Sequence, residues 1–214
     1  MSSNLERRRE QPDFQLVKER ATEFCRLFPG LASHEEMLDI LCILDTNTFQ
    51  VLALGSARNL AGLYLRVSLL NHSCVPNCRS IRVSKCKMSR LYVFFFRLIF
   101  RSDNSLQVRA SVRISKGEQV NISYTPPFFS VIARNNILHR GKQFLCSCRR
   151  CGDSTELGTF LSSARCRQCE VGLYQHTGNF SSEWTCSDCQ HHLTYQQYAA
   201  LDAKYLGKSL YDEL

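Results

Sequence analysis

Two CxxC pairs near the C-terminal end constrain the fold more than any other feature of this sequence. Cys166 and Cys169 form one pair, and Cys186 and Cys189 form the other. Each pair places two thiolates on one tight turn, and two such turns complete the tetrahedral coordination of a structural zinc ion. The alternative is two chance pairs of buried thiols. The spacing favours zinc and predicts a four-cysteine zinc ribbon.

The run CSCRRC, residues 146–151, supplies three more cysteines, whereas a structural zinc site needs four ligands. Cys25 and Cys42 lie in helical, apolar patterns and are expected to be core thiols. Cys74 and Cys78 flank a proline in a loop, and a loop can reach a distant cluster. We therefore expect this loop to donate the fourth ligand. A cysteine-protease role for Cys74 and a purely structural loop are the alternatives.

Composition favours metal binding over disulfides. The 214-residue chain contains 12 cysteines, and residues 1–12 are polar, without the apolar stretch of a secretory signal. Hydrophobic residues make up 44% of the chain, enough for the core of one domain, alone or with a small module. The most apolar run, residues 91–100, contains Arg97 and is too short to span a bilayer, so we expect no membrane association.

The chain is basic, with a formal net charge of +8 at pH 7 and an isoelectric point of about 9.0. This charge fits an acidic or nucleic-acid partner, but many soluble proteins with other functions are equally basic. We therefore do not expect direct nucleic-acid binding. A zinc ribbon that binds nucleic acid remains a weaker alternative.

The hydrophobic pattern alternates between helical and strand-like stretches. Apolar residues recur at helical spacing over residues 14–28, and Ser33 with Glu36 forms a capping box that begins the next helix. Alternating residues predict three strands, over residues 79–84, 105–114 and 119–124. Helical patterns return over residues 130–144 and 194–214. This order of elements predicts an α+β fold.

Three segments in this order resemble the second half of a SET domain and its post-SET cysteines: SLLNHSCVPNC (68–78), ISKGEQVNISY (114–124) and FLCSCRRC (144–151). Among SET proteins the chain is most similar to the SMYD (SET and MYND) family. The segment TELGTFLSSARCRQC (155–169) resembles the SmydA branch. The resemblance covers about residues 12–195. It implies S-adenosylmethionine-dependent methylation of lysine in proteins.

The resemblance assigns roles to five residues outside the cysteine clusters. Asn71 and His72 match the motif that binds S-adenosylmethionine, and Ser68 matches a residue that lines the same pocket. Tyr124 matches the active-site tyrosine and is implied in cofactor binding as well. Phe144 matches an aromatic residue that closes the cofactor and lysine pocket. Without this context, Tyr124 would equally fit a core tyrosine at the end of a strand.

The resemblance also completes the first zinc site. Cys74 is implied as the fourth ligand, together with Cys146, Cys148 and Cys151. With the ribbon, this gives two zinc sites and S-adenosylmethionine as the implied cofactors. The implied substrate is a lysine of a histone or of a non-histone protein, with chromatin or transcription partners and a location in the nucleus, the cytoplasm or both.

The chain departs from the family at its start and in one loop. The Gly-rich first strand and the MYND finger have no counterpart, and residues 1–60 match only the helical insert of the domain. We therefore expect a partial SET domain with impaired cofactor binding. The expected parts are a disordered N-terminus (1–12), a partial SET domain (13–145) with an atypical insert (85–104), the post-SET and zinc-ribbon region (146–195) and the start of a helical region (196–214).

The main alternative is a non-catalytic zinc-binding module that holds a protein partner or regulates transcription. Such a module would need the zinc sites and the basic charge but no cofactor pocket. Stoichiometric binding of S-adenosylmethionine would separate the two functions.

Overall fold

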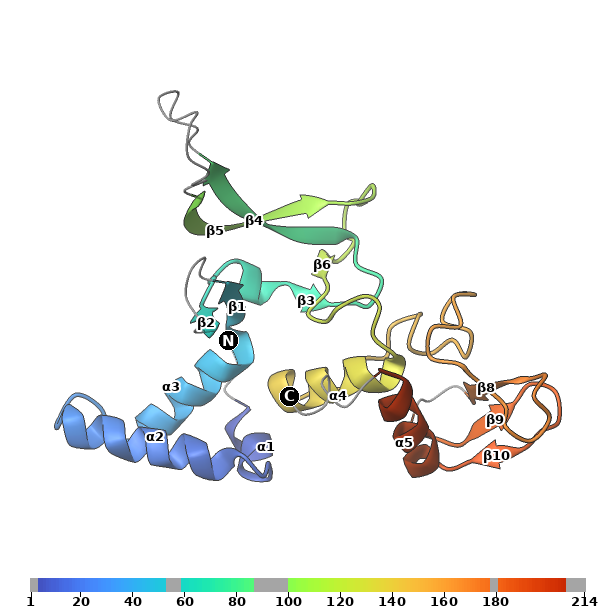
Figure 1. Ribbon diagram of the computed structural model, residues 1–214. Coiled ribbons are helices and arrows are strands. Elements are labelled where there is room, and N and C mark those ends of the chain that lie inside the picture. Colours follow the sequence, from blue (N-terminus) through green and yellow to red (C-terminus); the bar gives the residue numbers. More distant parts are fainter. Residues whose placement is uncertain (1–3, 53–58, 87–99, 178–180, 207–214) are drawn as a thin grey trace, which may run out of the picture. The chain divides into compact units, whose positions relative to one another are not determined.

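The computed structural model describes four stretches of the chain: residues 4–52, 59–86, 100–177 and 181–206 (Figure 1). The chain forms two compact units. The first unit comprises Met1–Asn71 and Pro76–Ile122, and the second comprises His72–Val75 and Ser123–Leu214. Among the described residues, no helix combines the length and the apolar character needed to cross a membrane.

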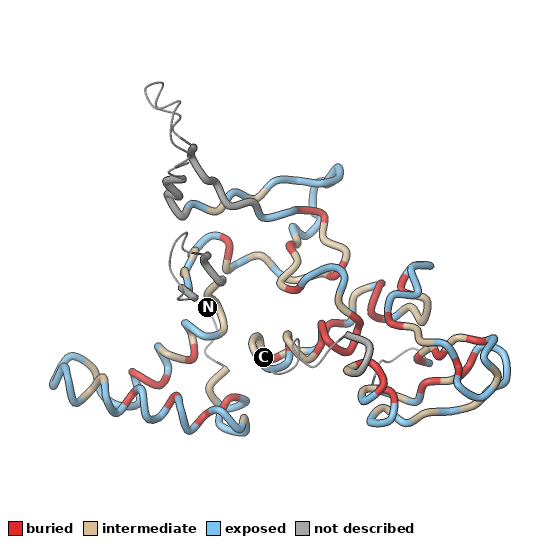
Figure 2. Tube along the Cα trace, in the orientation of Figure 1, coloured by how far each residue is buried: buried red, intermediate tan, exposed pale blue. Residues whose placement is uncertain are grey.

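The first unit begins with three helices: α1 (Leu5–Arg9), α2 (Phe14–Leu27) and α3 (His34–Asn47). One face of α2 and one face of α3 are buried against each other, as the tube in Figure 2 shows by its red stripes. Their common core consists of Phe14, Val17, Ala21, Met37, Leu38 and Cys42. The predicted helical spacing over residues 14–28 is confirmed, and so is the prediction that Cys42 is a core thiol.

The capping box at the start of α3 is present as predicted. The Ser33 hydroxyl accepts a hydrogen bond from the Glu36 amide at 3.2 Å, and the Ser33 amide donates to the Glu36 carboxylate at 2.8 Å. The sequence of α3 is apolar on most faces and suggests a buried helix, but Ile40 is 45% and Leu44 is 36% exposed. In the first unit, α1 and α2 pack against α3 and leave these side chains uncovered.

The expected disordered start of the chain differs from the structure, in which α1 occupies residues 5–9. Arg8 of this helix is buried and forms an ion pair with Asp45 of α3 at 3.5 Å. Leu5 packs against the core that α2 and α3 share. Tertiary packing of Leu5 and Arg8 therefore orders a segment whose polar sequence gave no helical signal.

Two pairs of strands in the first unit are antiparallel. β1 (Phe49–Leu52) pairs with β2 (Asn59–Gly62), and β4 (Cys78–Cys86) pairs with β5 (Phe100–Ala110). A 3-10 turn (Val67–Leu69) precedes the short strand β3 (Asn71–His72), which pairs with β6 (Asn121–Ile122). The strands β4 and β5 include both ends of the predicted 85–104 insert, and residues 87–99 lie outside the described residues.

The predicted strand over residues 119–124 shortens to β6 because the side chain of Asn77 takes the place of a partner strand. Asn77 donates to the Gln119 carbonyl and accepts from the Asn121 amide, both at 2.8 Å. The preceding turn, residues 115–118, contains Gly117 at a φ of +88°, which favours glycine.

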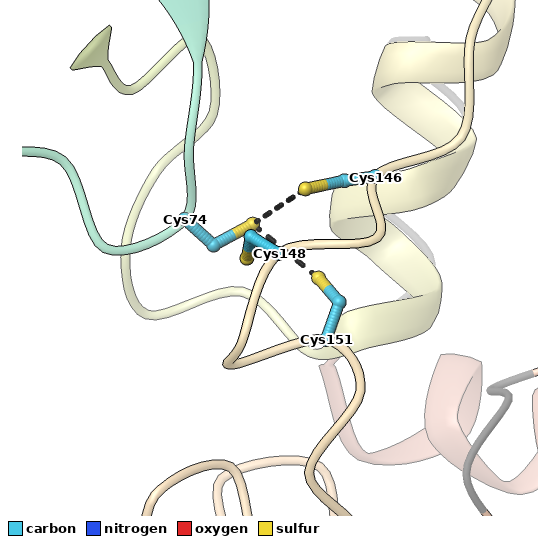
Figure 3. A group of neighbouring side chains, drawn as sticks. All are labelled: Cys74, Cys146, Cys148 and Cys151. Atoms are coloured by element: carbon cyan, nitrogen blue, oxygen red, sulfur yellow. Dashed lines mark hydrogen bonds between the residues drawn. The ribbon is translucent and has the colours of Figure 1, made fainter. Parts of the chain in front are cut away.

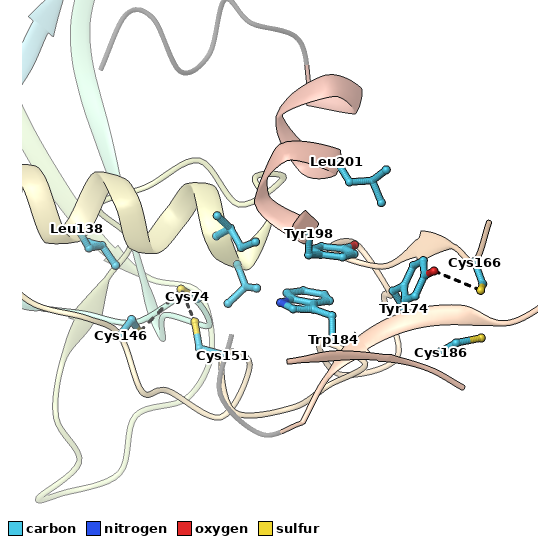
Figure 4. Close-up of a cluster of buried hydrophobic side chains, with 12 residues drawn as sticks. Cys74, Leu138, Cys146, Cys151, Cys166, Tyr174, Trp184, Cys186, Tyr198 and Leu201 are labelled. Atoms are coloured by element: carbon cyan, nitrogen blue, oxygen red, sulfur yellow. Dashed lines mark hydrogen bonds between the residues drawn. The ribbon is translucent and has the colours of Figure 1, made fainter. Parts of the chain in front are cut away.

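The second unit contains α4 (Val131–Lys142), a four-stranded antiparallel sheet and α5 (Tyr195–Leu206). The sheet has the order β10-β9-β8-β7, with β7 (Ala164–Arg165), β8 (Leu173–His176), β9 (Trp184–Cys186) and β10 (His192–Leu193). In its core, the Trp184 ring stacks on the Tyr198 ring with centroids 3.6 Å apart (Figure 4). Ser130, the N-cap of α4, donates to Asp202 of α5 at 2.6 Å.

Candidate functional site

Four cysteines of the second unit form the first cluster: Cys74, Cys146, Cys148 and Cys151. Cys74 comes from the loop after β3, and the other three follow α4 (Figure 3). The Cys74 sulfur lies 3.9 Å from that of Cys146 and 3.5 Å from that of Cys151, and the four sulfurs all lie within 4.8 Å of one another. Sulfurs bound about 2.3 Å from a tetrahedral zinc ion lie about 3.8 Å apart, so the cluster fits zinc.

The structure places Cys74, and not Cys78, with the three cysteines of the CSCRRC run. Cys78, the other loop cysteine, is buried as the first residue of β4 and does not belong to the cluster. Hydrogen bonding to Cys146 raises the pKa of Cys74, so this thiol keeps its proton until a metal displaces it. Hydrogen bonding to Cys148 holds the pKa of Cys146 well below its ordinary value.

Two side chains of α4 support the first cluster from behind. Arg134 is fully buried and points a guanidinium nitrogen at the Cys151 sulfur, 3.7 Å away. Asn135, also fully buried, accepts a hydrogen bond from the Cys146 amide at 2.7 Å. A zinc ion with four thiolates carries two negative charges, which a buried guanidinium partly neutralises. These contacts fix the orientation of two ligands.

Glu156 holds that guanidinium in place. Its carboxylate is 1% exposed and forms ion pairs with Arg134 at 2.6 Å and Arg150 at 3.0 Å. Ser162 donates a further hydrogen bond to it at 2.9 Å. Glu156 adopts a φ of +50°, an uncommon conformation for a residue other than glycine. This buried network links the CSCRRC run to the segment that leads into β7.

The second cluster consists of Cys166, Cys169, Cys186 and Cys189, again within 4.8 Å of one another. The Cys166 and Cys189 sulfurs are 3.7 Å apart, and so are those of Cys169 and Cys186. These distances fit tetrahedral zinc as well as those of the first cluster. Cys189 is exposed, whereas the first cluster contains no exposed ligand.

Both turns of the second cluster direct backbone amides at sulfur. The Gln168 amide donates to Cys166 at 3.3 Å, and the Asp188 amide donates to Cys186 at 3.4 Å. Such bonds stabilise the thiolate form. Gly172 lies where the two turns meet, since a Cβ atom at this position would be 2.4 Å from the Cys186 sulfur.

A tyrosine and a histidine extend the second cluster. The Tyr174 hydroxyl lies 3.4 Å from the Cys166 sulfur and 2.9 Å from Nδ1 of His191. Burial opposes ionisation of Cys166, but its hydrogen bond with the Tyr174 hydroxyl and hydrogen bonds from backbone amides lower the pKa of this thiol to about 6. Burial and the Cys166 thiol raise the pKa of Tyr174 to about 12. Tyr174 therefore stays a hydrogen-bond donor at neutral pH.

Three aromatic rings of the second unit gather beside the first cluster. The His72 ring lies 5.3 Å from the Tyr124 ring and 6.1 Å from the Phe144 ring, between centroids. The Lys142 ammonium lies 5.5 Å from the centroid of the Tyr124 ring. Burial raises the pKa of Tyr124, which keeps its hydroxyl protonated at neutral pH. The structure thus brings together three of the predicted site residues.

The other two predicted cofactor residues, Ser68 and Asn71, belong to the first unit. The Ser68 hydroxyl donates to the carbonyls of Asn47 and Tyr64, at 3.0 and 2.9 Å. Asn71 is exposed. Two cavities of the second unit, with volumes of about 510 and 330 Å³, lie beside the second cluster and are not lined by Tyr124.

Sequence reasoning missed the residues that support the clusters. Arg134, Asn135 and Glu156 are polar residues whose burial depends on tertiary packing, so periodicity gave no signal for them. The sequence gave only a weak indication of the role of Asn77, which lies inside the segment SLLNHSCVPNC, one residue before Cys78. Gly172 stood out only as a glycine close to a CxxC pair.

A family model for the SET domain matches residues 5–125. This is more than half of the chain, and the chain belongs to the SET domain family. The match ends just after Tyr124, so it includes the NHSC motif and the tyrosine of the aromatic group.

Curated relatives indicate the SMYD type of SET protein. The chain is 29% identical over 186 residues to isoform B of SET domain-containing protein SmydA-8 of Drosophila melanogaster, which covers 80% of this chain and 36% of that protein. It is 26% identical to a SET and MYND domain-containing protein of Dictyostelium discoideum, over 59% of this chain and 31% of the other. It is 29% identical to histone-lysine N-methyltransferase SET5 of Saccharomyces cerevisiae, over 69% of this chain and 23% of that protein. The chain spans about a third of the length of the first two relatives.

Proposed function

We propose that the protein functions as an S-adenosylmethionine-dependent protein-lysine methyltransferase of the SET type. The observation that carries the proposal is the group of His72, Tyr124 and Phe144 beside the first cysteine cluster, in a chain of the SET family. Relatives whose names describe histone-lysine methyltransferases support the reaction class.

The aromatic group suits a cationic methyl donor. S-adenosylmethionine supplies a methyl group on a positively charged sulfonium. Aromatic faces attract such cations, and the Lys142 ammonium, 5.5 Å from the centroid of the Tyr124 ring, shows that this ring can have a cation beside it. We assign cofactor contacts to Ser68, Asn71, Tyr124 and Phe144. His72 would contribute its ring face or backbone, because both ring nitrogens have partners within the protein.

The same group suits a lysine acceptor. The amine must be neutral and held in line with the methyl group while water is excluded. The protonated hydroxyl of Tyr124 can orient the amine through a hydrogen bond. The rings of Phe144 and Tyr124 would exclude water from the amine. Tyr124 is therefore the catalytic residue of the proposal.

Zinc at both clusters would give this region its structure. We propose that the first cluster is the post-SET zinc site and the second a zinc ribbon, within the regions 13–145 and 146–195. Zinc between Cys74 and Cys146 would close a loop of 72 residues and hold the NHSC motif beside residues 144–151.

We propose a protein lysine, in a histone or another protein, as the substrate. The names of the relatives support this class, and the nucleus or the cytoplasm is the proposed location. Chromatin or transcription complexes are the proposed partners.

Calorimetric titration of S-adenosylmethionine into zinc-loaded protein tests the proposal against the non-catalytic module. Methyltransferase function predicts saturable binding of one equivalent, with the low affinity expected from the sequence, and this binding should be lost when zinc is removed. Protein that holds both zinc ions but binds no cofactor would support the module instead.

Methyl transfer tests the role of Tyr124. With labelled cofactor and lysine-containing protein substrates, Tyr124→Phe should reduce turnover about 100-fold or more, the range of a positioned proton donor or acceptor. Cys25→Ser, outside both clusters, is the control. Wild-type turnover in Tyr124→Phe would remove the catalytic assignment.

A further inference from the structure

We propose that His72 is a positioning residue whose imidazole joins the Cys74 sulfur of the first cluster to the backbone of Tyr124. Nε2 of His72 lies 3.2 Å from the Cys74 sulfur, and Nδ1 accepts a hydrogen bond from the Tyr124 amide at 2.9 Å. The catalytic consequence rests on the proposed function, whereas the connection itself does not.

The backbone partner fixes the tautomer of His72. An amide N–H can only donate, so Nδ1 must be the unprotonated nitrogen. A neutral imidazole then carries its proton on Nε2, and this proton faces the Cys74 sulfur. Zinc binding would make that sulfur a thiolate and so a stronger acceptor. The imidazole can satisfy both partners in one tautomer.

The connection places a metal ligand and the proposed catalytic residue two hydrogen bonds apart. Cys74 and Tyr124 are 50 residues apart in sequence, and the imidazole spans the gap between them. Hydrogen bonds to metal ligands orient the ligand and increase metal affinity. Zinc should therefore order the Tyr124 backbone through His72, in addition to closing the loop.

The half-buried ring also has the packing expected of a fixed group. The centroid of the His72 ring is 5.3 Å from that of the Tyr124 ring and 6.1 Å from that of the Phe144 ring, and both pairs of planes are tilted. A rotation of the imidazole would break both hydrogen bonds and these contacts together. The position of Tyr124 is thus set by the ring as a whole.

Two conservative substitutions separate the two halves of the connection. In His72→Asn, the amide oxygen can occupy the place of Nδ1 and accept from Tyr124, but no donor reaches Cys74. In His72→Gln, the amide nitrogen can occupy the place of Nε2 and donate to Cys74, while the bond to Tyr124 is lost. His72→Phe removes both and keeps the ring.

Two readouts follow the two halves. Native mass spectrometry during a chelator titration measures the zinc affinity of each cluster, with Cys74→Ser identifying the first. Hydrogen exchange of the Tyr124 amide, measured by NMR on zinc-loaded protein, follows the backbone bond. Loss of a hydrogen bond to a metal ligand typically reduces metal affinity about 10–100-fold, which we expect for His72→Phe and His72→Asn. His72→Gln should keep the zinc affinity of the first cluster. Hydrogen exchange of the Tyr124 amide should be faster in His72→Gln and in His72→Phe, and should stay slow in His72→Asn.

The proposal is overturned if His72→Phe changes neither readout, or if the Asn and Gln variants change the same readout. A protonated Nδ1 in the ¹⁵N spectrum of zinc-loaded wild type would also overturn it. No readout requires cofactor or substrate. Failure of S-adenosylmethionine to bind wild-type protein would therefore remove the proposed function and leave the connection intact.

Discussion

Both clusters consist of four cysteine sulfurs, but they differ in how far apart their cysteines lie in the sequence. The second gathers its ligands from residues 166–189, on two turns of one small sheet. The first takes Cys74 from a loop that lies 72 residues before Cys146 in the sequence. A local cluster can form with little help from the rest of the fold, whereas a distant one needs a structure that brings its ligands together.

The residues around the two clusters differ as well: the first cluster contacts side chains from distant parts of the sequence, and the second contacts mainly its own turns. The first cluster is backed by the buried charges of Arg134 and Glu156 and touched by His72. Backbone amides and the Tyr174 hydroxyl serve the second, and one of its ligands is exposed. The first cluster is therefore tied to α4 and the aromatic group, and the second mainly stabilises its own sheet. This difference is why the proposed function assigns its site to the neighbourhood of the first cluster.

Removing both zinc ions should have the largest effect. Structural zinc contributes about 10–16 kcal/mol of apparent folding free energy in small domains. Five ligands belong to the core around Trp184, which is the chain's single tryptophan. Chelation should shift tryptophan emission to longer wavelength, while the helical circular dichroism of α2 and α3 should persist, because their core contains no cluster cysteine. Unchanged emission in zinc-free protein would contradict this.

Glu156→Gln should weaken the first cluster selectively. The substitution leaves Arg134 and Arg150 without their buried carboxylate, and breaking such a pair costs about 3–5 kcal/mol. Denaturant unfolding followed by Trp184 fluorescence measures the loss, and native mass spectrometry should show earlier zinc release from the first cluster. Glu183→Gln, at an exposed position, is the matched control. Equal effects of the two variants would show that the network is not needed.

Gly172→Ala is the corresponding test of the second cluster. The added methyl group would lie 2.4 Å from the Cys186 sulfur and 2.8 Å from the Asp188 amide nitrogen. We expect a loss of about 1–3 kcal/mol, as for overpacked sites, with zinc released first from the second cluster. Gly152→Ala is the control beside the first cluster, because its nearest neighbour is the Cys148 oxygen at 3.8 Å. Normal zinc retention by Gly172→Ala would contradict the geometry.

The smallest effect concerns the first unit, which contains neither cluster. Ser33→Ala removes the N-cap of α3 and should lower the free energy of unfolding by about 1 kcal/mol without changing zinc content. Hydrogen bonds from the Ser33 amide and hydroxyl hold the pKa of Glu36 below its ordinary value. Their contribution is present above the unfolded-state pKa and is lost as pH falls through the lowered value. Thermal unfolding between pH 6 and pH 3 should therefore show a weaker acid dependence in the variant.

The sequence revealed the local features of this protein and little of what joins them. The second cluster and the capping box follow from spacings of three residues, and the structure has both. For the first cluster, the residues alone left Cys74 and Cys78 open as the fourth ligand, and the family resemblance pointed to Cys74. Spacing holds no information about a contact across 72 residues, because the fold between them decides it.

The supporting residues were beyond sequence reasoning for a different physical reason. Arg134 lies in a helix where an arginine normally faces water, and its ion pair with Glu156 and its hydrogen bond to the Phe129 carbonyl make complete burial tolerable. Glu156 itself comes from a loop with no periodic pattern. Tertiary packing also decides the structure of α1, whose polar sequence suggested disorder although Arg8 is buried.

The most direct test of the central claim is to count zinc ions in wild-type protein and in Cys74→Ser by native mass spectrometry. The claim is that zinc joins Cys74 to the CSCRRC run and so builds the site around Tyr124. We expect two zinc ions in the wild type and one in Cys74→Ser, with the second cluster still occupied. Two tightly held zinc ions in Cys74→Ser, or fewer than two in well-folded wild-type protein, would contradict the account.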